Sequence, residues 1–191
     1  MIRVALLADT HGQLDARIGD LVRVCDIAVH GGDIGNADIL ARLQPRSGHV
    51  YAVRGNNDVP RKWPEGDRIL LERLPEQAVV ELPGGSLVIL HGHHLAAAGR
   101  HARLRREHPH ARAIVYGHSH LLVADRETSP WVLNPGAAGR ARSYGGPSCL
   151  ILAATNSDWH LDIHRFALAD TRRSRVPRRV RQPDAAGEVD P

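Results

Sequence analysis

The chain has 191 residues, 42% of them hydrophobic and 24% charged, which is ordinary for a globular protein long enough to bury one domain core. The formal net charge is +4, but residues 171–191 alone hold six Arg and three acidic residues, so the positive charge is concentrated there. The first apolar run stops at Asp9, which is too early for a secretory signal peptide, and no later apolar run is long enough to span a membrane. The spacing of Cys25 and Cys149 is not that of a metal site or a redox motif. We therefore expect a cytoplasmic protein with buried, reduced thiols.

The first half of the chain alternates between strand-like and helix-like patterns. Residues 2–8 form an apolar run broken only by Arg3, typical of a strand buried on both faces, and a helical pattern follows at 14–24. Shorter strand patterns at 26–30 and 49–54 repeat the arrangement. This alternation is typical of α/β layering, in which ligands bind beyond the carboxyl ends of the strands.

The second half is richer in strands. Residues 77–82 and 86–90 flank a Pro-Gly-Gly turn, which predicts a hairpin, and residues 95–107 have a helical pattern with Arg on the polar side. Five further segments predict strands, at 113–116, 121–126, 131–133, 149–153 and 160–166. Apolar periodicity then ends, so we predict a folded domain at 1–168 and a basic, disordered tail at 169–191.

Polar residues follow the first two predicted strands. Asp9 and His11 are two positions apart, and an extended backbone would aim both side chains to one side, where a cation could bind them. The plainer alternative is an Asp that caps the next helix beside an incidental His. Asp33 follows paired glycines that permit a sharp turn, and its two carboxylate oxygens could bridge two cations. A turn-stabilising Asp is the alternative there.

The third predicted strand ends in Gly55-Asn56-Asn57-Asp58. Asn56 offers a neutral carbonyl oxygen as a ligand, and Asp58 is suited to accept a hydrogen bond from the N–H of a ligating histidine. Taken by itself, this sequence is a loop.

Histidines close two later strands. His118 and His120 are separated by one residue, so an extended backbone would aim both rings to the same side, and His91 ends another strand. We interpret His93 and His94 as solvated loop residues or outer partners of a site. The seven remaining histidines lack convergent spacing, and we interpret them as structural or exposed: His30, His49, His101, His108, His110, His160 and His164.

In chain order these fragments read D-x-H, G-D, G-N-x-D, H-G and G-H-x-H. The set resembles the calcineurin-like metallophosphoesterase superfamily over roughly residues 1–168, and the small size with Asn134-Pro135-Gly136 resembles its compact YfcE-type phosphodiesterases. The resemblance implies an α/β (α+β) sandwich of two mixed β-sheets flanked by helices, with the site at one edge. It also implies two metal ions, one held by Asp9, His11, Asp33 and His120, the other by Asp33, Asn56, His91 and His118.

The implied activity is a two-metal phosphodiesterase acting on a phosphate-ester small molecule or nucleotide. Two cations roughly 3.5–4 Å apart activate a bridging water and neutralise the phosphoryl oxygens, so no protein nucleophile is required. We predict that Asn56, Asp58 and His91 act closest to the chemistry. Mn²⁺ is the first expectation, with Fe, Ni, Co and Zn also compatible with His, Asp and Asn ligands. Because imidazole must be neutral to bind a metal, activity should fall at acid pH and vanish with chelator.

The sequence departs from the family pattern at two positions. Many members have His where this chain has Asn57, and that His is thought to protonate the leaving group, whereas an amide supplies no proton at neutral pH. We therefore expect a preference for diesters with good leaving groups over alkyl monoesters. Ala137 replaces the Ser that often follows Asn-Pro-Gly.

Three other interpretations stay open. A phosphomonoesterase or nucleotide pyrophosphatase would use the same metals. A non-catalytic scaffold, as in the retromer subunit with this fold, is less favoured because all seven ligand positions hold competent residues. The Arg-rich tail could bind nucleic acid, although a solvated tail is the simpler interpretation. The sequence does not determine the oligomeric state.

Overall fold

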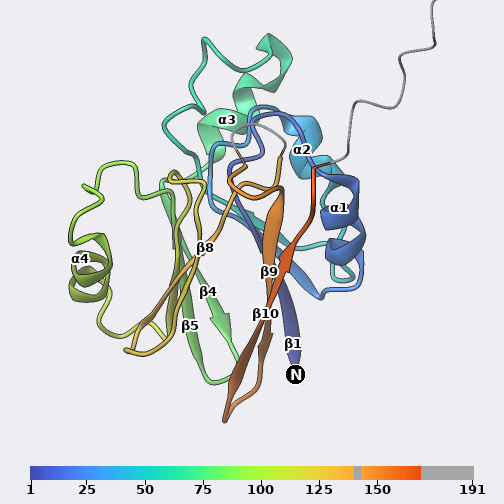
Figure 1. Cartoon of the computed structure of the whole chain (residues 1–191). Coiled ribbons are helices and arrows are strands. Elements are labelled where there is room, and N and C mark those ends of the chain that lie inside the picture. The colour runs from blue at the N-terminus through green and yellow to red at the C-terminus, as the bar shows by residue number, and fades with distance from the viewer. Residues whose placement is uncertain (140–142, 169–191) are drawn as a thin grey trace, which may run out of the picture.

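The computed structural model describes residues 1–139 and 143–168, so the tail predicted at 169–191 lies outside the described residues. Within them, ten strands form two five-stranded sheets that share one apolar core (Figure 1). Both sheets mix parallel and antiparallel neighbours, and helices flank them. The predicted sandwich of two mixed sheets is confirmed.

The first sheet has the strand order β10-β9-β1-β2-β3. Its strands are β1 (Ile2–Leu7), β2 (Ile27–His30), β3 (Val50–Ala52), β9 (Ser148–Ala154) and β10 (Trp159–Arg165). β1, β2 and β3 run parallel, whereas β9 pairs antiparallel with both β1 and β10. Leu7 pairs with His30 and His30 pairs with Ala52, so the parallel strands end level and their following loops meet at one edge.

The second sheet has the strand order β4-β5-β6-β8-β7. Its strands are β4 (Gln77–Leu82), β5 (Gly85–Leu90), β6 (Ala113–Val115), β7 (Leu122–Asp125) and β8 (Trp131–Pro135). β4 and β5 form the predicted hairpin, and β5, β6 and β8 run parallel. The loops that follow β5 and β6 therefore lie at the same edge of this sheet.

The alternation of side chains along β1 explains why its sequence is apolar apart from Arg3 near its start. Val4 and Leu6 face the core between the two sheets, whereas Ala5 and Leu7 face the helices on the outer side. Each fully buried Leu or Val contributes about 1.5–3 kcal/mol, and truncating Leu6, which has no exposed surface, to Ala would cost about 2–5 kcal/mol.

Helices cover the outer faces of both sheets (Figure 1). α1 (Ala16–Arg23), α2 (Ala37–Arg42) and α3 (Arg68–Arg73), the last preceded by the 3-10 turn η1 (Glu65–Asp67), pack their apolar residues on the first sheet. α4 (Arg100–Glu107) packs Leu104 against the second sheet. No helix in the described part of the chain is long and apolar enough to cross a lipid bilayer.

Several element boundaries differ from the predictions. The helix predicted at 14–24 begins at Ala16, because the carboxylate of Asp15 accepts a hydrogen bond from the Arg17 backbone N–H at 3.0 Å and caps it. The helix predicted at 95–107 begins only at Arg100, after Gly99 in the left-handed region. α2 and α3 were not predicted, because six residues are too few to show a helical period.

Both cysteines are buried free thiols, as predicted. Burial raises the pKa of Cys149 to about 12. The thiol therefore stays protonated and unreactive at neutral pH.

Candidate metal centre

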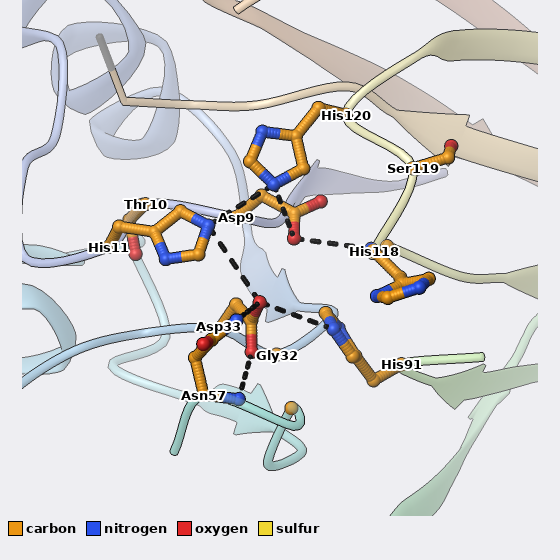
Figure 2. Close-up of polar contacts among 12 residues, drawn as sticks. Asp9, Thr10, His11, Gly32, Asp33, Asn57, His91, His118, Ser119 and His120 are labelled. Atoms are coloured by element: carbon orange, nitrogen blue, oxygen red, sulfur yellow. Dashed lines mark hydrogen bonds and ion pairs between the residues drawn. The ribbon is translucent and has the colours of Figure 1, made fainter. Parts of the chain in front are cut away.

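Five loops at one edge of the sandwich bring the predicted ligands together (Figure 2). They follow β1, β2, β3, β5 and β6, which are the strands whose ends the sequence motifs mark. Every predicted ligand lies within 3.7 Å of another one, and together they are Asp9, His11, Asp33, Asn56, His91, His118 and His120. These loops come from both sheets, so the site exists only when the two sheets are packed.

One group of ligand atoms consists of Asp9, His11 and His120. The Nε2 atoms of His11 and His120 are 3.2 Å apart, and Nε2 of His120 lies 3.6 Å from Oδ1 of Asp9. Asp9 and His120 are buried, whereas the His11 side chain keeps 18% of its surface exposed. Two imidazole nitrogens and a carboxylate converging at this range are a suitable set for a transition metal.

A second group surrounds Nε2 of His91. This nitrogen lies 3.4 Å from Oδ2 of Asp33 and 3.1 Å from Oδ1 of Asn56. The Asn56 oxygen lies equally close, at 3.1 Å, to Nδ1 of His118. The amide oxygen of Asn56 thus joins two imidazoles that come from different strands of the second sheet.

Asp33 lies between the two groups. Its Oδ2 is 3.7 Å from Nε2 of His11 and 3.4 Å from Nε2 of His91, as the dashed lines in Figure 2 show. Ligand atoms of Asp9, Asp33 and His91 also lie within 4.8 Å of one another. This placement is compatible with the hypothesis that the Asp33 carboxylate is shared by two cations.

The backbone of the ligand loops is not extended, so the reasoning that paired the side chains by extended geometry was wrong. The positive-φ residues other than glycine in the described chain are all predicted ligands: Asp9 (53°), His11 (47°), Asp33 (55°), His118 (67°) and His120 (57°). A left-handed conformation costs an L-residue roughly 1–2 kcal/mol. Such strain is found where tertiary contacts impose a functional geometry.

Hydrogen bonds between loops hold this strained backbone. The Asp9 N–H donates to the Gly32 carbonyl at 3.0 Å, and the His11 N–H donates to the Asp33 carbonyl at 2.9 Å. These bonds tie the loop after β1 to the loop after β2. The side chains of Asp9, His11 and Asp33 therefore converge because of loop-to-loop pairing.

His91 and Asp33 are electrostatically coupled. Burial lowers the pKa of His91, but the hydrogen bond and charge of Asp33 outweigh it and hold the pKa above its usual value. Burial raises the pKa of Asp33, but His91 and Asn57 outweigh that and hold it well below its usual range. The Nδ1–H of His91 donates to the Gly31 carbonyl at 2.8 Å, which directs Nε2 toward the cluster, as in metal-ligating histidines.

Asp58 does not hold a histidine, contrary to the prediction. Its Oδ1 accepts from the backbone N–H groups of Ile34 and Gly35 and from the Trp63 indole, at 2.9 to 3.0 Å. Its Oδ2 accepts from Gly55 N–H at 2.8 Å. In the described residues its hydrogen bonds all go to such donors, so the buried carboxylate joins the loop that carries Asp33 to the loop that carries Asn56.

His30 is structural, one of the two roles expected for it, and it supports the ligand loops. It is fully buried beneath the loops, and its Nδ1 accepts from the Gly32 N–H at 3.2 Å. The proton therefore sits on Nε2, which donates to the Thr10 hydroxyl at 2.9 Å, and that hydroxyl donates to the Ile34 carbonyl. Burial and the nearby His91 lower the pKa of His30 to about 3, so it is neutral. The sequence feature that indicates this supporting role is the position of His30 at the end of β2, just before Gly31-Gly32-Asp33.

Two further residues border the centre. His93 is exposed, as predicted, and its ring lies 5.6 Å from that of His91 and 6.3 Å from that of His118. Asn134 supports the histidine loop, because its side-chain NH₂ donates to the Gly117 carbonyl at 2.8 Å.

A cavity of about 370 Å³ opens beside the centre. Asn56 and His93 line it, together with Arg54, Glu72 and Glu76. The guanidinium of Arg54 contacts the carboxylate of Glu76 at 2.7 Å. A ligand bound at the centre could extend into this cavity.

Comparisons with known proteins agree with this geometry. The family model of the calcineurin-like phosphoesterase superfamily domain matches residues 2–157. Comparison with curated proteins gave no match. Similar solved structures include Vps29 from Entamoeba histolytica complexed with Zn²⁺, with a TM-score of 0.65 and 19% identity over 86% of this chain and 98% of that one.

Two other similar structures are phosphoesterases by description. An archaeal phosphodiesterase has a TM-score of 0.62 and 21% identity over 85% of this chain and 100% of that one. A predicted phosphoesterase from Streptococcus pneumoniae has a TM-score of 0.58 and 22% identity over 86% and 89% of the two chains. At these identities the structures show a shared fold, and the family match shows membership. The chain belongs to the calcineurin-like phosphoesterase superfamily.

Proposed function

We propose that the protein is a phosphodiesterase that binds two divalent cations through the seven clustered side chains. The observation that carries this proposal is the position of Asp33, whose Oδ2 lies within 3.7 Å of His11 in one group and of His91 in the other. The donor set fits divalent metals, because it combines carboxylates, imidazoles and an amide oxygen. Mn²⁺ is the first candidate, and Fe, Co, Ni and Zn suit the same ligands.

Bound cations would supply an activated water and would neutralise charge on the phosphoryl oxygens. The protein's own residues orient the ligands. Gly31 fixes the ring of His91, and Asn57 donates to both carboxylate oxygens of Asp33, from its backbone N–H at 2.8 Å and its side chain at 2.6 Å. The cavity beside Asn56 provides room for one ester substituent of the substrate.

The leaving-group preference follows from Asn57. Its amide cannot protonate a departing oxygen at neutral pH. We therefore propose that aryl diesters are better substrates than alkyl monoesters.

The test uses the purified full-length chain, stripped of metal with chelator and then supplemented with Mn²⁺. Hydrolysis of bis(4-nitrophenyl) phosphate should require the metal and should exceed that of 4-nitrophenyl phosphate. His91→Ala should lower activity by at least about 100-fold, whereas His160→Ala, at an exposed position on β10, should leave it unchanged. Metal-independent hydrolysis, or a strong preference for the monoester, would refute the proposal.

A protein-binding scaffold is the second candidate, because Vps29 structures are among those similar to this chain. One of those structures contains Zn²⁺. Metal binding alone therefore cannot separate the two candidates, and hydrolysis does. A protein that binds metal stoichiometrically but hydrolyses none of a panel of monoesters, diesters, cyclic nucleotides and dinucleotides would be a scaffold.

A further inference from the structure

Lys62 is the only lysine in the chain, and it lies beside the candidate centre. It belongs to the loop between β3 and η1, and its ammonium donates a hydrogen bond to the side-chain oxygen of Asn57. Asn57 in turn donates to both carboxylate oxygens of Asp33. A positive charge is thus connected to the shared carboxylate through a single amide side chain.

The ammonium is available to a ligand. Lys62 is exposed, and among the described residues no carboxylate lies within 4.0 Å of its Nζ. Arg54, another cation beside this loop, is already paired with Glu76 at 2.7 Å. Lysine has three N–H donors, and Asn57 accepts one, so two remain for an incoming phosphate oxygen.

We propose that Lys62 contacts the phosphodiester and stabilises the leaving oxygen as the P–O bond breaks, which rests on the proposed function. The oxygen of the attacking water bonds to phosphorus, and the electron pair of the breaking P–O bond goes to the leaving oxygen. The ammonium stabilises the resulting charge by a hydrogen bond, and the leaving oxygen takes its proton from water. Asn57 is the positioning residue that holds the ammonium on the Asp33 side of the cluster. A proton-donating side chain at position 57 would stabilise the leaving oxygen by protonating it. Lys62 supplies part of that stabilisation through its positive charge.

The first test reads binding without turnover. Because the chain has one lysine, protein labelled with ¹⁵N-lysine gives a single side-chain signal, which is assigned to Lys62 without further work. Inorganic phosphate is titrated into the full-length, Zn²⁺-loaded protein. The signal should shift with the dissociation constant that calorimetry gives, and Lys62→Met should weaken phosphate binding by about tenfold. A signal that stays constant while calorimetry shows phosphate bound would overturn the proposal.

The second test reads the leaving group. Lys62→Met should reduce kcat/KM by about 100-fold for phenyl methyl phosphate, where the leaving oxygen is basic, and by less than about tenfold for 4-nitrophenyl methyl phosphate. Lys62→Arg keeps the charge and should recover most of the loss. Arg61→Met removes an equal charge from the neighbouring exposed position and should change neither value.

The outcomes separate this proposal from the function on which it rests. If the metal-loaded wild-type protein hydrolyses the esters but Lys62→Met loses the same factor on both, Lys62 has no leaving-group role and the phosphodiesterase assignment stands. If the wild-type protein hydrolyses no ester, the proposed function is wrong and this role is wrong with it.

Discussion

Replacing Asp58 with Asn separates a structural role of this carboxylate from a catalytic one. Its two oxygens accept hydrogen bonds from Ile34, Gly35, Gly55 and Trp63. The amide that Asp58→Asn introduces can take two orientations. In the less damaging one, its oxygen stays near the Trp63 indole N–H and its NH₂ group faces the Gly55 backbone N–H. That leaves a buried backbone donor without an acceptor and turns the remaining charge-assisted hydrogen bonds into neutral ones.

The expected cost is roughly 2–6 kcal/mol, from about 1–3 kcal/mol for the unsatisfied donor and a similar loss over the weakened bonds. For a chain of this length each kcal/mol lowers the Tm by about 2–4 °C, so the Tm should fall by roughly 4–24 °C. The control is Asp20→Asn on the exposed surface of α1, where the ion pair with Arg23 contributes at most about 1 kcal/mol.

Both variants are unfolded with urea in metal-free buffer, and metal affinity and hydrolysis are measured separately. Asp58→Asn should be the less stable by the stated amount and should bind metal more weakly, because the loops carrying Asp33 and Asn56 are no longer joined. If Asp58→Asn unfolds like Asp20→Asn yet loses activity, the carboxylate acts in catalysis and the structural reasoning is refuted.

Three further predictions follow from the loops around the centre. A Cβ at Gly55 would lie 2.2 Å from Oδ1 of Asp33, so Gly55→Ala should reduce the metal affinity measured by calorimetry by at least about tenfold. Gly66→Ala is the control, because a Cβ at Gly66 would have nothing within 4 Å, and it should not reduce the affinity. Equal affinities of the two variants would contradict the packing argument. His30 has its pKa lowered from 6.5 to about 3, so its contribution to stability is intact above about pH 6.5 and declines below it by about 1.4 kcal/mol per pH unit. Urea unfolding of metal-free protein at pH 6.5 and pH 4.5 should show a decline larger by about 2.3 kcal/mol in wild type than in His30→Gln, and equal declines would exclude this role. The pKa of His91 is raised, so a metal must displace its proton and should bind more weakly as pH falls. Calorimetry in two buffers of different ionisation enthalpy should detect this proton release. Identical binding enthalpies in the two buffers would argue against proton release.

The order of the motifs carried most of what could be inferred about the candidate site. Each ligand lies in the loop that follows a strand, and the ends of parallel strands meet at one edge of a sheet. This rule places Asp9, Asp33 and Asn56 together without any knowledge of side-chain contacts. The apolar run from Val4 to Leu7 in β1 likewise predicts a strand covered on both faces, as found.

Contacts between distant segments could not be inferred in the same way. The left-handed backbone at Asp9 and His118 contradicts the extended geometry expected from local preference, because hydrogen bonds and packing between loops decide it. The partner of Asp58 was expected to be a histidine and is instead a set of backbone and indole donors. A carboxylate accepts from any donor that the fold brings within reach, and residue type alone does not select among them.

By itself the sequence determined which residues could ligate metals and which strands carry them, and its resemblance to the superfamily implied a sandwich of two sheets. Only the tertiary structure decided that Asp33 lies between His11 and His91, that buried His30 supports the loops, and that Lys62 reaches Asn57. The physical reason is range. Apolar periodicity records local burial along one strand or helix, whereas these contacts depend on how the loops of two sheets are oriented when the core between them is packed.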